Sequence, residues 1–258
     1  AADALEQQQL VLEQAALQKE MTSALSSSAK GLKKSKKLLS QAETAVEDAS
    51  EARDAADGRL FSPSAARNRA AIADVLDVVL PREARVLEVG SGTGEHAVAA
   101  CQQRPDILWH PSDPDAESRR SQQAWSSEVD GRIQSPLALD LTRADWWQDA
   151  PEIDALVCMN VIHISPWSVA QHLAAGGAAL LQPGQRVFTY GPYKEGERTA
   201  PSNLAFDANL KSRNPEWGVR DLEAVVALFE AAGFVLERRI DMPANNLSLV
   251  FEKKGEAV

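Results

Sequence analysis

Residues 86–96 read Val-Leu-Glu-Val-Gly-Ser-Gly-Thr-Gly-Glu-His, an apolar run followed by three glycines that alternate with small polar residues. The apolar run predicts a buried strand, and the residues after the last glycine predict the start of a helix. Glycine can adopt positive φ and lets the backbone approach a ligand, and the helix N-terminus presents free N–H groups to that ligand. The segment therefore predicts a strand, a turn and a helix that together bind a nucleotide.

The glycine spacing narrows the choice of nucleotide. Gly90, Gly92 and Gly94 are each separated by one residue, whereas nicotinamide-dependent oxidoreductases prefer Gly-x-Gly-x-x-Gly. Glu88 stands two residues before the first glycine. This combination favours S-adenosylmethionine over a dinucleotide, with Ser91 and the three glycines as its predicted contacts.

Two aspartates follow at positions that suit an adenosine ligand. Asp113 comes nineteen residues after Gly94, just beyond the apolar run 107–110, where a carboxylate can accept hydrogen bonds from both ribose hydroxyls. Asp140 ends the run 137–140 and can accept from the adenine amino group. The alternatives are a turn-forming role for Asp113 and a helix cap or surface role for Asp140.

The chain divides into two unlike parts. The first sixty residues hold no aromatic residue and no proline, whereas all 14 aromatic residues and all 13 prolines lie beyond them. Residues 1–58 are rich in strong helix formers, so we expect a helical arm or hairpin, with leucines at heptad spacing that suit a coiled coil or a docking contact. Residues 59–258 form the second predicted domain. A basic run at 30–37 is either a solvated face or a contact for an acidic partner.

From residue 61 onward, helical and strand-like patterns alternate. A helix is predicted for 64–79, and strands for 85–89, 107–110, 137–139, 153–159, 186–190, 234–240 and 247–251. Helical segments between the earlier strands indicate an α/β fold with a mostly parallel sheet of seven strands and helices on both faces.

Composition excludes several classes of protein. No apolar stretch is long enough to span a membrane, and no hydrophobic signal segment opens the chain. The formal charge of −10 disfavours broad nucleic-acid binding. Cys101 and Cys158 lie in apolar contexts that predict free, buried thiols, and no cluster has metal-ligand spacing, so we expect no metal. Localisation is open between the cytoplasm and, after removal of a targeting segment, a mitochondrion or plastid.

The chain resembles the class I S-adenosylmethionine-dependent methyltransferases, and within them the family called domain of unknown function 938, which includes methyltransferase-like protein 26. Besides the glycine segment, short blocks carry this resemblance: 61–63 (Phe-Ser-Pro), 67–69 (Arg-Asn-Arg), 111–115 (Pro-Ser-Asp-Pro-Asp), 160–167 (Asn-Val-Ile-His-Ile-Ser-Pro-Trp), 190–193 (Tyr-Gly-Pro-Tyr), 200–203 (Ala-Pro-Ser-Asn), 216–221 (Glu-Trp-Gly-Val-Arg-Asp) and 242–246 (Met-Pro-Ala-Asn-Asn). The resemblance covers residues 61–252 and leaves the N-terminal arm outside.

The resemblance implies a Rossmann-like sheet of seven strands in the order 3-2-1-4-5-7-6, with the cofactor over the C-terminal ends of the first strands. It implies that Glu88 lies near the methionine amino group, that Gly90 and Gly92 contact the methionine portion, and that Asp113 and Asp140 hold the ribose and the adenine. Asn160 is a further expected cofactor contact.

Three residues are candidates for the chemical step. Asn160 and His163 follow the fourth predicted strand, where an acceptor would meet the methyl group, and a histidine of ordinary pKa suits proton removal near neutrality. Tyr190 follows the fifth predicted strand and can donate a hydrogen bond. The alternatives are that His163 orients its turn and that Tyr190 packs in the core.

The substrate candidates lie in the other blocks of the resemblance. An arginine of residues 67–69 can clamp a carboxylate through its planar fork. The expected acceptor contacts are Arg67, Asn68, Tyr193, Asn203 and Trp217.

Two functions follow from the sequence. The first is a methyltransferase whose acceptor, a small molecule or a protein side chain, is undetermined. The second is a methyltransferase-like subunit of a larger, possibly organellar, assembly, attached to a protein partner through residues 1–58, with cofactor binding retained or idle. Oligomeric state is not determined by the sequence.

Overall fold

A computed structural model describes residues 57–255. The predicted helical arm, its coiled-coil pattern and the partner contact expected of it fall almost wholly on residues 1–56, outside the described residues. These expectations stay predictions.

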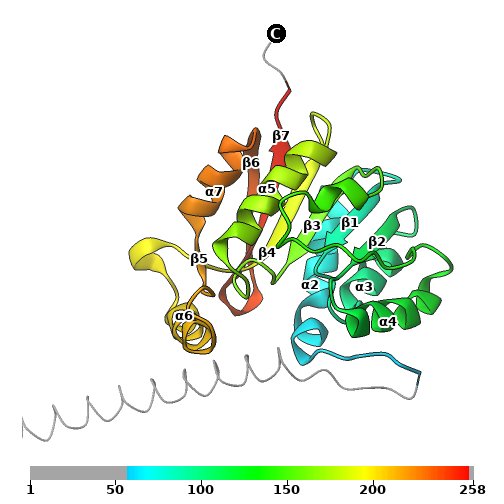
Figure 1. Cartoon of the computed structure of the whole chain (residues 1–258), viewed down its shortest axis with the longest axis horizontal. Helices are drawn as coiled ribbons and strands as arrows, with labels where there is room; N and C mark the ends of the chain where they lie inside the picture. The colour runs from blue at the N-terminus through cyan, green and yellow to red at the C-terminus, as the bar shows by residue number, and fades with distance from the viewer. Residues whose placement is uncertain (1–56, 256–258) are drawn as a thin grey trace, which may run out of the picture.

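The described chain forms a mixed α/β sheet (Figure 1). Six strands are hydrogen-bonded in the order β2-β1-β3-β4-β7-β6, and a short seventh strand, β5, pairs with the end of β4. Among the described strands, β7 alone runs against the direction of the others, so its pairings with β4 and β6 are antiparallel. The strands are β1 (Arg85–Val89), β2 (Leu108–Ser112), β3 (Ala155–Met159), β4 (Arg186–Lys194), β5 (Arg220–Asp221), β6 (Phe234–Met242) and β7 (Asn246–Lys253).

One predicted strand is much reduced. The segment expected as a strand at 137–139 pairs with β2 through one isolated parallel bridge, from Leu137 to Ser112, and a second bridge, from Ile133 to Trp109, lies just before it. Pro111 in β2 and Pro136 in the edge segment have no N–H to donate, so a continuous ladder cannot form there. With this segment counted as the third strand in chain order, the sheet has the expected order 3-2-1-4-5-7-6.

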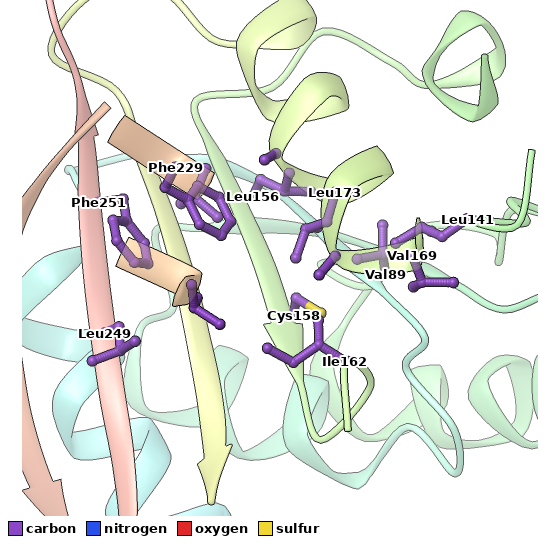
Figure 2. Close-up of a cluster of buried hydrophobic side chains, with 14 of the residues drawn as sticks. Val89, Leu141, Leu156, Cys158, Ile162, Val169, Leu173, Phe229, Leu249 and Phe251 are labelled. Atoms are coloured by element: carbon purple, nitrogen blue, oxygen red, sulfur yellow. The ribbon is translucent and has the colours of Figure 1, made fainter. Parts of the chain in front are cut away.

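Helices cover both faces of the sheet. Apolar residues of α2 and α3 pack on one face, around Val86, Val157 and Phe188. Those of α5 and α7 pack on the other, which lies toward the viewer in Figure 1 and is shown in close-up in Figure 2. The helices are α2 (Pro63–Val79), α3 (Glu95–Gln103), α4 (Ala116–Trp125), α5 (Trp167–Leu180), α6 (Pro201–Arg213) and α7 (Leu222–Ala231), with 3-10 turns η1 (Ser126–Val129), η2 (Trp146–Asp149), η3 (Gly196–Arg198) and η4 (Pro243–Asn245).

The β4 strand is longer than predicted. Tyr190 and Tyr193 were expected to follow a strand ending at residue 190, but both lie inside β4. The Gly191-Pro192 dipeptide resembles a turn, yet Gly191 pairs with Leu247 and Pro192 with Asn246 of β7, and this pairing keeps the segment extended. The two tyrosines consequently point to opposite faces: Tyr190 toward α2 and Tyr193 toward α5 and α7.

The first described residues are fastened to α4. The Leu60 N–H donates to Ser121 Oγ at 2.8 Å, and the Trp125 indole N–H donates to the Leu60 carbonyl at 3.1 Å. Phe61 packs edge-on against Trp125, and the Arg59 guanidinium lies 4.7 Å from the centre of the Trp125 ring. The segment before α2 is thereby tied to the helix that flanks the glycine turn.

Candidate functional site

The turn between β1 and α3 has the backbone that its glycines predict. Gly90, Gly92 and Gly94 have φ of 66°, 53° and 93°. A Cβ on Gly90 would lie 2.6 Å from Val161 Cγ2, and one on Gly94 would lie 3.0 Å from the Gln122 Cα. Gly90 and Gly94 are therefore required both by backbone conformation and by close neighbours, while a Cβ on Gly92 would meet open space.

Polar groups of α4 and β2 hold this turn in place through hydrogen bonds to its backbone. Gln122 Nε2 donates to the Gly92 carbonyl at 2.9 Å, and the Ser121 hydroxyl donates to the Thr93 carbonyl at 2.7 Å. The Ser91 N–H donates to the Ser112 carbonyl at 2.8 Å. Two carbonyls of the turn are thus bonded to α4, and the turn is also tied to the end of β2.

Asp113 lies directly beside the glycine turn. Its Oδ2 accepts the Gly92 N–H at 3.0 Å, and its Oδ1 accepts the Asp115 N–H at 3.0 Å. Burial raises the pKa of Asp113 above its usual value. The carboxylate is therefore held at the C-terminal end of β2, beside the backbone of the glycine turn.

Asp140 is committed in part to its own turn. Its Oδ1 accepts both the N–H and the hydroxyl of Thr142, at 2.9 and 2.7 Å. The sequence left open a helix cap or a surface role for Asp140, and the structure instead shows a turn role. An adenine contact would use the remaining acceptor capacity of the carboxylate.

Glu88 is a buried carboxyl group without an ion pair in the described part of the chain. It is 1% exposed, and Trp109 Nε1 donates to its Oε2 at 3.0 Å. Burial raises the pKa of Glu88 to about 7, against the hydrogen bonds from Trp109 and Ser91, which lower it. A cation brought beside it would convert it to the carboxylate.

Sequence reasoning missed the role of Glu95, the first residue of α3. This carboxylate is 2% exposed and accepts from the Ser62 N–H at 2.7 Å, from Thr93 Oγ1 at 3.0 Å and from the Arg69 guanidinium at 3.1 Å. It therefore joins the start of α2 to the glycine turn. An acidic residue in the first turn of a helix was the available signal, because it complements the helix dipole.

A second link between α2 and α3 involves two predicted site residues. His96 Nε2 lies 2.8 Å from Asn68 Oδ1. The Asn68 side chain also hydrogen-bonds the Tyr190 hydroxyl, which lowers the pKa of Tyr190, although burial has the larger effect and raises it. The structure thus brings together one substrate candidate, one catalytic candidate and a histidine that the sequence left unassigned.

The loop between β3 and α5 brings Asn160 and His163 to the C-terminal edge of the sheet. Asn160 has φ of 58°, and its N–H donates to the Tyr190 carbonyl at 2.9 Å. A Cβ on Gly191 would lie 2.9 Å from His163 Cε1 and 3.6 Å from Asn160 Oδ1. Asn160 and His163 therefore meet over the same glycine of β4.

His163 does not have the pKa that the sequence suggested. It is 3% exposed, its Nδ1 has no hydrogen-bond partner in the described chain, and its ring packs edge-on against Phe206. Burial, together with the nearby charge of Arg220, lowers the pKa of His163 to about 3. The expectation of a group that titrates near neutrality is wrong, because α6 covers the ring, and the imidazole is neutral at physiological pH.

Arg220 holds the loop that carries His163. Its Nε donates to the Ile162 carbonyl at 2.8 Å, and its guanidinium also donates to the carbonyls of Ser165 and Glu216. Its guanidinium carbon lies 5.7 Å from the centre of the Trp167 ring. Arg220 is thus a structural clamp on this loop.

Two expected substrate residues have structural roles. Tyr193 is 2% exposed, lies in the core beneath α5 and α7, and its hydroxyl pairs with Thr189 Oγ1 at 2.8 Å. Asn203 is 5% exposed, and its Nδ2 donates to the carbonyls of Tyr193 and Asn245. Core packing and backbone hydrogen bonds occupy both side chains in this structure, and their contact with an acceptor stays a prediction.

The other two substrate candidates lie nearer the surface. Arg67 is exposed on α2, and Trp217 is half-buried with the Arg213 guanidinium carbon 5.6 Å from its ring centre. The N–H of the next residue, Gly218, donates to the His163 carbonyl at 2.9 Å. Trp217 therefore lies close to the loop that carries His163.

Two cavities lie away from the glycine turn. One of about 210 Å³ opens at the end of β4, between the start of α6 and the β6–β7 turn, and includes Arg198, Asp241 and Asn245 in its lining. A larger one of about 470 Å³ lies at the opposite edge, where β1 and β4 begin. Within residues 57–255, no group of three or more His, Cys, Asp or Glu could hold a metal ion, and no helix is long and apolar enough to cross a membrane.

The geometry and the sequence agree with one protein family. The family model described as "Protein of unknown function (DUF938)" matches residues 59–253. The chain belongs to this family. The match begins at residue 59, the first residue of the second domain predicted from composition. The matched residues include the glycine turn, Asp113 and the loop of His163.

Solved methyltransferase structures have the same fold as this DUF938 chain. The pyocyanin biosynthetic protein PhzM matches with a TM-score of 0.63 and 20% identity, over 74% of this chain and 56% of its own. CalO1, a methyltransferase of calicheamicin biosynthesis solved with S-adenosylhomocysteine, matches with a TM-score of 0.61 and 18% identity, over 74% of this chain and 55% of its own. Human N-acetylserotonin methyltransferase, solved with S-adenosylmethionine, matches with a TM-score of 0.59 and 16% identity, over 74% of this chain and 52% of its own.

These matches establish the fold. This chain spans little more than half the length of each of these proteins. The α/β Rossmann-like methyltransferase fold is therefore confirmed, and the parts that the larger proteins add are not matched.

Proposed function

We propose that this protein is an S-adenosylmethionine-dependent methyltransferase. The observation that carries the proposal is the position of the Asp113 carboxylate, bonded to the Gly92 N–H within a turn of three positive-φ glycines at the end of β1. An acidic group beside exposed backbone at a helix N-terminus suits a ligand that has ribose hydroxyls and polar groups.

The residues present fit the cofactor. Its methionine portion carries an ammonium group, and Glu88 is a buried carboxyl group with no basic partner among residues 57–255. Glu88 would hold the ammonium, Asp113 the ribose, Asp140 the adenine, and Gly90, Ser91 and the backbone near Asn160 the methionine chain. The cofactor supplies an activated methyl group, so the protein mainly needs to align the acceptor and exclude water.

We propose a small molecule with a hydroxyl group as the acceptor. Support comes from the matched proteins, several of which are named O-methyltransferases, including one from Burkholderia thailandensis with a TM-score of 0.64 and 14% identity. The neutral His163 ring can accept a hydrogen bond from such a hydroxyl. With a pKa of about 3, it orients the nucleophile, and the proton that the hydroxyl loses on methyl transfer passes to water rather than staying on His163.

The test is transfer of a labelled methyl group from S-adenosylmethionine to a panel of phenols and alcohols by the full chain. Asp113→Ala should abolish transfer, and Asp149→Asn, on the exposed η2 turn, should leave it unchanged. Transfer to protein lysine or arginine side chains with none to hydroxyl compounds would refute the proposed acceptor. Absence of transfer to any acceptor, by a protein that also fails to bind the cofactor, would refute the function itself.

A further inference from the structure

Beneath α2, three polar side chains form a connected chain on one face of the sheet. His96 comes from the first turn of α3, Asn68 from α2 and Tyr190 from β4. His96 Nε2 and Asn68 Oδ1 are 2.8 Å apart, and the Asn68 side chain also reaches the Tyr190 hydroxyl. Tyr190 is 2% exposed as a residue, and its ring packs in the core beneath α2.

The hydrogen bonds that link His96, Asn68 and Tyr190 all run in one direction. An amide oxygen can only accept, so His96 Nε2 must carry the proton that it shares with Asn68 Oδ1. Asn68 then has only its Nδ2 hydrogens for Tyr190, whose oxygen accepts one of them. The hydroxyl hydrogen of Tyr190 is therefore not used by Asn68 and is available for another acceptor.

The strand register puts Tyr190 level with the glycine turn. Val89 pairs with Cys158 and Met159 pairs with Tyr190, so the next residue of the β1 chain, Gly90, falls in the same row as Tyr190. Neighbouring strands lie about 4.8 Å apart, so the two spacings from β1 across β3 to β4 separate these positions by about 10 Å. Alternation places Glu88 on the same face as Tyr190, two residues before Gly90.

One further polar group lies in this row. Ser248 of β7 pairs directly with Tyr190, and its Oγ is buried without a hydrogen-bond partner in the described chain. Directly paired antiparallel residues point to the same face, so the polar character of the row continues past Tyr190. The face beneath α2 thus carries Tyr190 and Ser248 side by side in this row, while the neighbouring Leu249 lies on the other face.

We propose that the Tyr190 hydroxyl donates a hydrogen bond to the carboxylate of the cofactor's methionine portion, and that Asn68 and His96 act as positioning residues that direct this hydroxyl. The inference rests on the proposed function and deepens it. Glu88 and Tyr190 then divide the amino acid end of the cofactor between them: the carboxylate of Glu88 takes the ammonium group, and the hydroxyl of Tyr190 takes the carboxylate. Both side chains lie on the face of the sheet that α2 and α3 cover, so one ligand can contact both of them.

Two ligands separate this contact from the rest of the site. S-adenosylhomocysteine carries the amino and carboxylate groups, whereas 5′-methylthioadenosine keeps the adenosine and the sulfur but lacks both. Tyr190→Phe should weaken S-adenosylhomocysteine roughly tenfold, as expected for loss of a hydrogen bond to a charged group, and leave 5′-methylthioadenosine unchanged. Tyr193→Phe removes the hydroxyl from the opposite face of the same strand and should change neither affinity.

Two further variants test the direction of the hydrogen bonds that run from His96 through Asn68 to Tyr190. Asn68→Asp replaces the Nδ2 donor with an acceptor, so Tyr190 should turn its hydrogen toward residue 68 and the loss should match that of Tyr190→Phe. His96→Gln keeps a donor for Asn68 and should retain most of the affinity. A merely structural role for Asn68 would weaken both ligands together.

Each outcome decides the matter. If wild-type protein binds S-adenosylhomocysteine and Tyr190→Phe leaves that affinity unchanged, or weakens both ligands equally, the inference is overturned and the proposed function stands. If wild-type protein binds neither ligand, the proposed function itself fails. Binding of 5′-methylthioadenosine by each variant also reports that the site has folded.

Discussion

Glu88→Gln should make the protein more stable and less able to bind its cofactor. Burial raises the pKa of Glu88 from 4.5 to about 7. The folded protein therefore holds this proton more tightly than the unfolded chain does, so the stability linked to Glu88 is complete below pH 4.5 and is lost as the pH rises through 7. The rise in the pKa of Glu88 from 4.5 to about 7 corresponds to a loss of about 3 kcal/mol in the free energy of unfolding at pH 8.

Glutamine removes the titrating group and keeps an oxygen for the bond from Trp109 Nε1. The free energy of unfolding of Glu88→Gln, measured in urea, should exceed that of the wild type by up to about 3 kcal/mol at pH 8 and by much less at pH 5. Loss of the carboxylate should weaken S-adenosylhomocysteine roughly tenfold to a hundredfold, because a hydrogen bond to a charged group is lost. The wild-type affinity should also fall as the pH drops below 7.

Glu95→Gln is the matched control, since Glu95 is equally buried but is paired with the Arg69 guanidinium and accepts the Ser62 N–H. This variant should lose about 1–3 kcal/mol of stability at pH 8, because the hydrogen bonds that the buried carboxylate accepts from the half-exposed Arg69 guanidinium and from the Ser62 N–H are weakened. The reasoning would be refuted if Glu88→Gln were no more stable than the wild type at pH 8. Unchanged ligand affinity in Glu88→Gln would refute the contact with the ammonium group.

Three further expectations concern other positions. Gly94→Ala should lower the free energy of unfolding by about 2 kcal/mol and weaken S-adenosylhomocysteine, since φ is 93° and the Gln122 Cα is 3.0 Å away; wild-type affinity would contradict this. Gly176→Ala should lose about 2 kcal/mol despite its better helix propensity, because the new Cβ would lie 2.2 Å from Trp146 Cζ2; a gain in melting temperature would contradict it. His163→Asn should reduce the fall in stability between pH 6 and pH 5 by about 1 kcal/mol, because the depressed pKa makes the wild type lose stability as the pH falls from 6.5 toward 3; parallel pH profiles would contradict it.

The backbone of the glycine turn and the place of Asp113 beside it were predictable from sequence because their requirements are local. Positive φ at Gly90, Gly92 and Gly94 and an acidic residue after the next strand are properties of short segments. Their spacing, and the burial of the first strand, gave both the fold and the position of Asp113. No distant contact was needed for these inferences.

Other features depended on contacts between distant segments. Tyr190 and Tyr193 point to opposite faces because pairing with β7 keeps Gly191 and Pro192 extended. His163 has a depressed pKa because α6 and the Arg220 clamp bury it. Glu95 joins α2 to the glycine turn, which only the folded chain brings together.

Calorimetric titration of the full chain with S-adenosylhomocysteine tests the central claim most directly. The account predicts binding of one molecule per chain with micromolar affinity, and loss of that binding in Asp113→Ala while the variant still unfolds cooperatively. A folded wild-type protein that gives no heat of binding would contradict the claim that the glycine turn and Asp113 form a cofactor site.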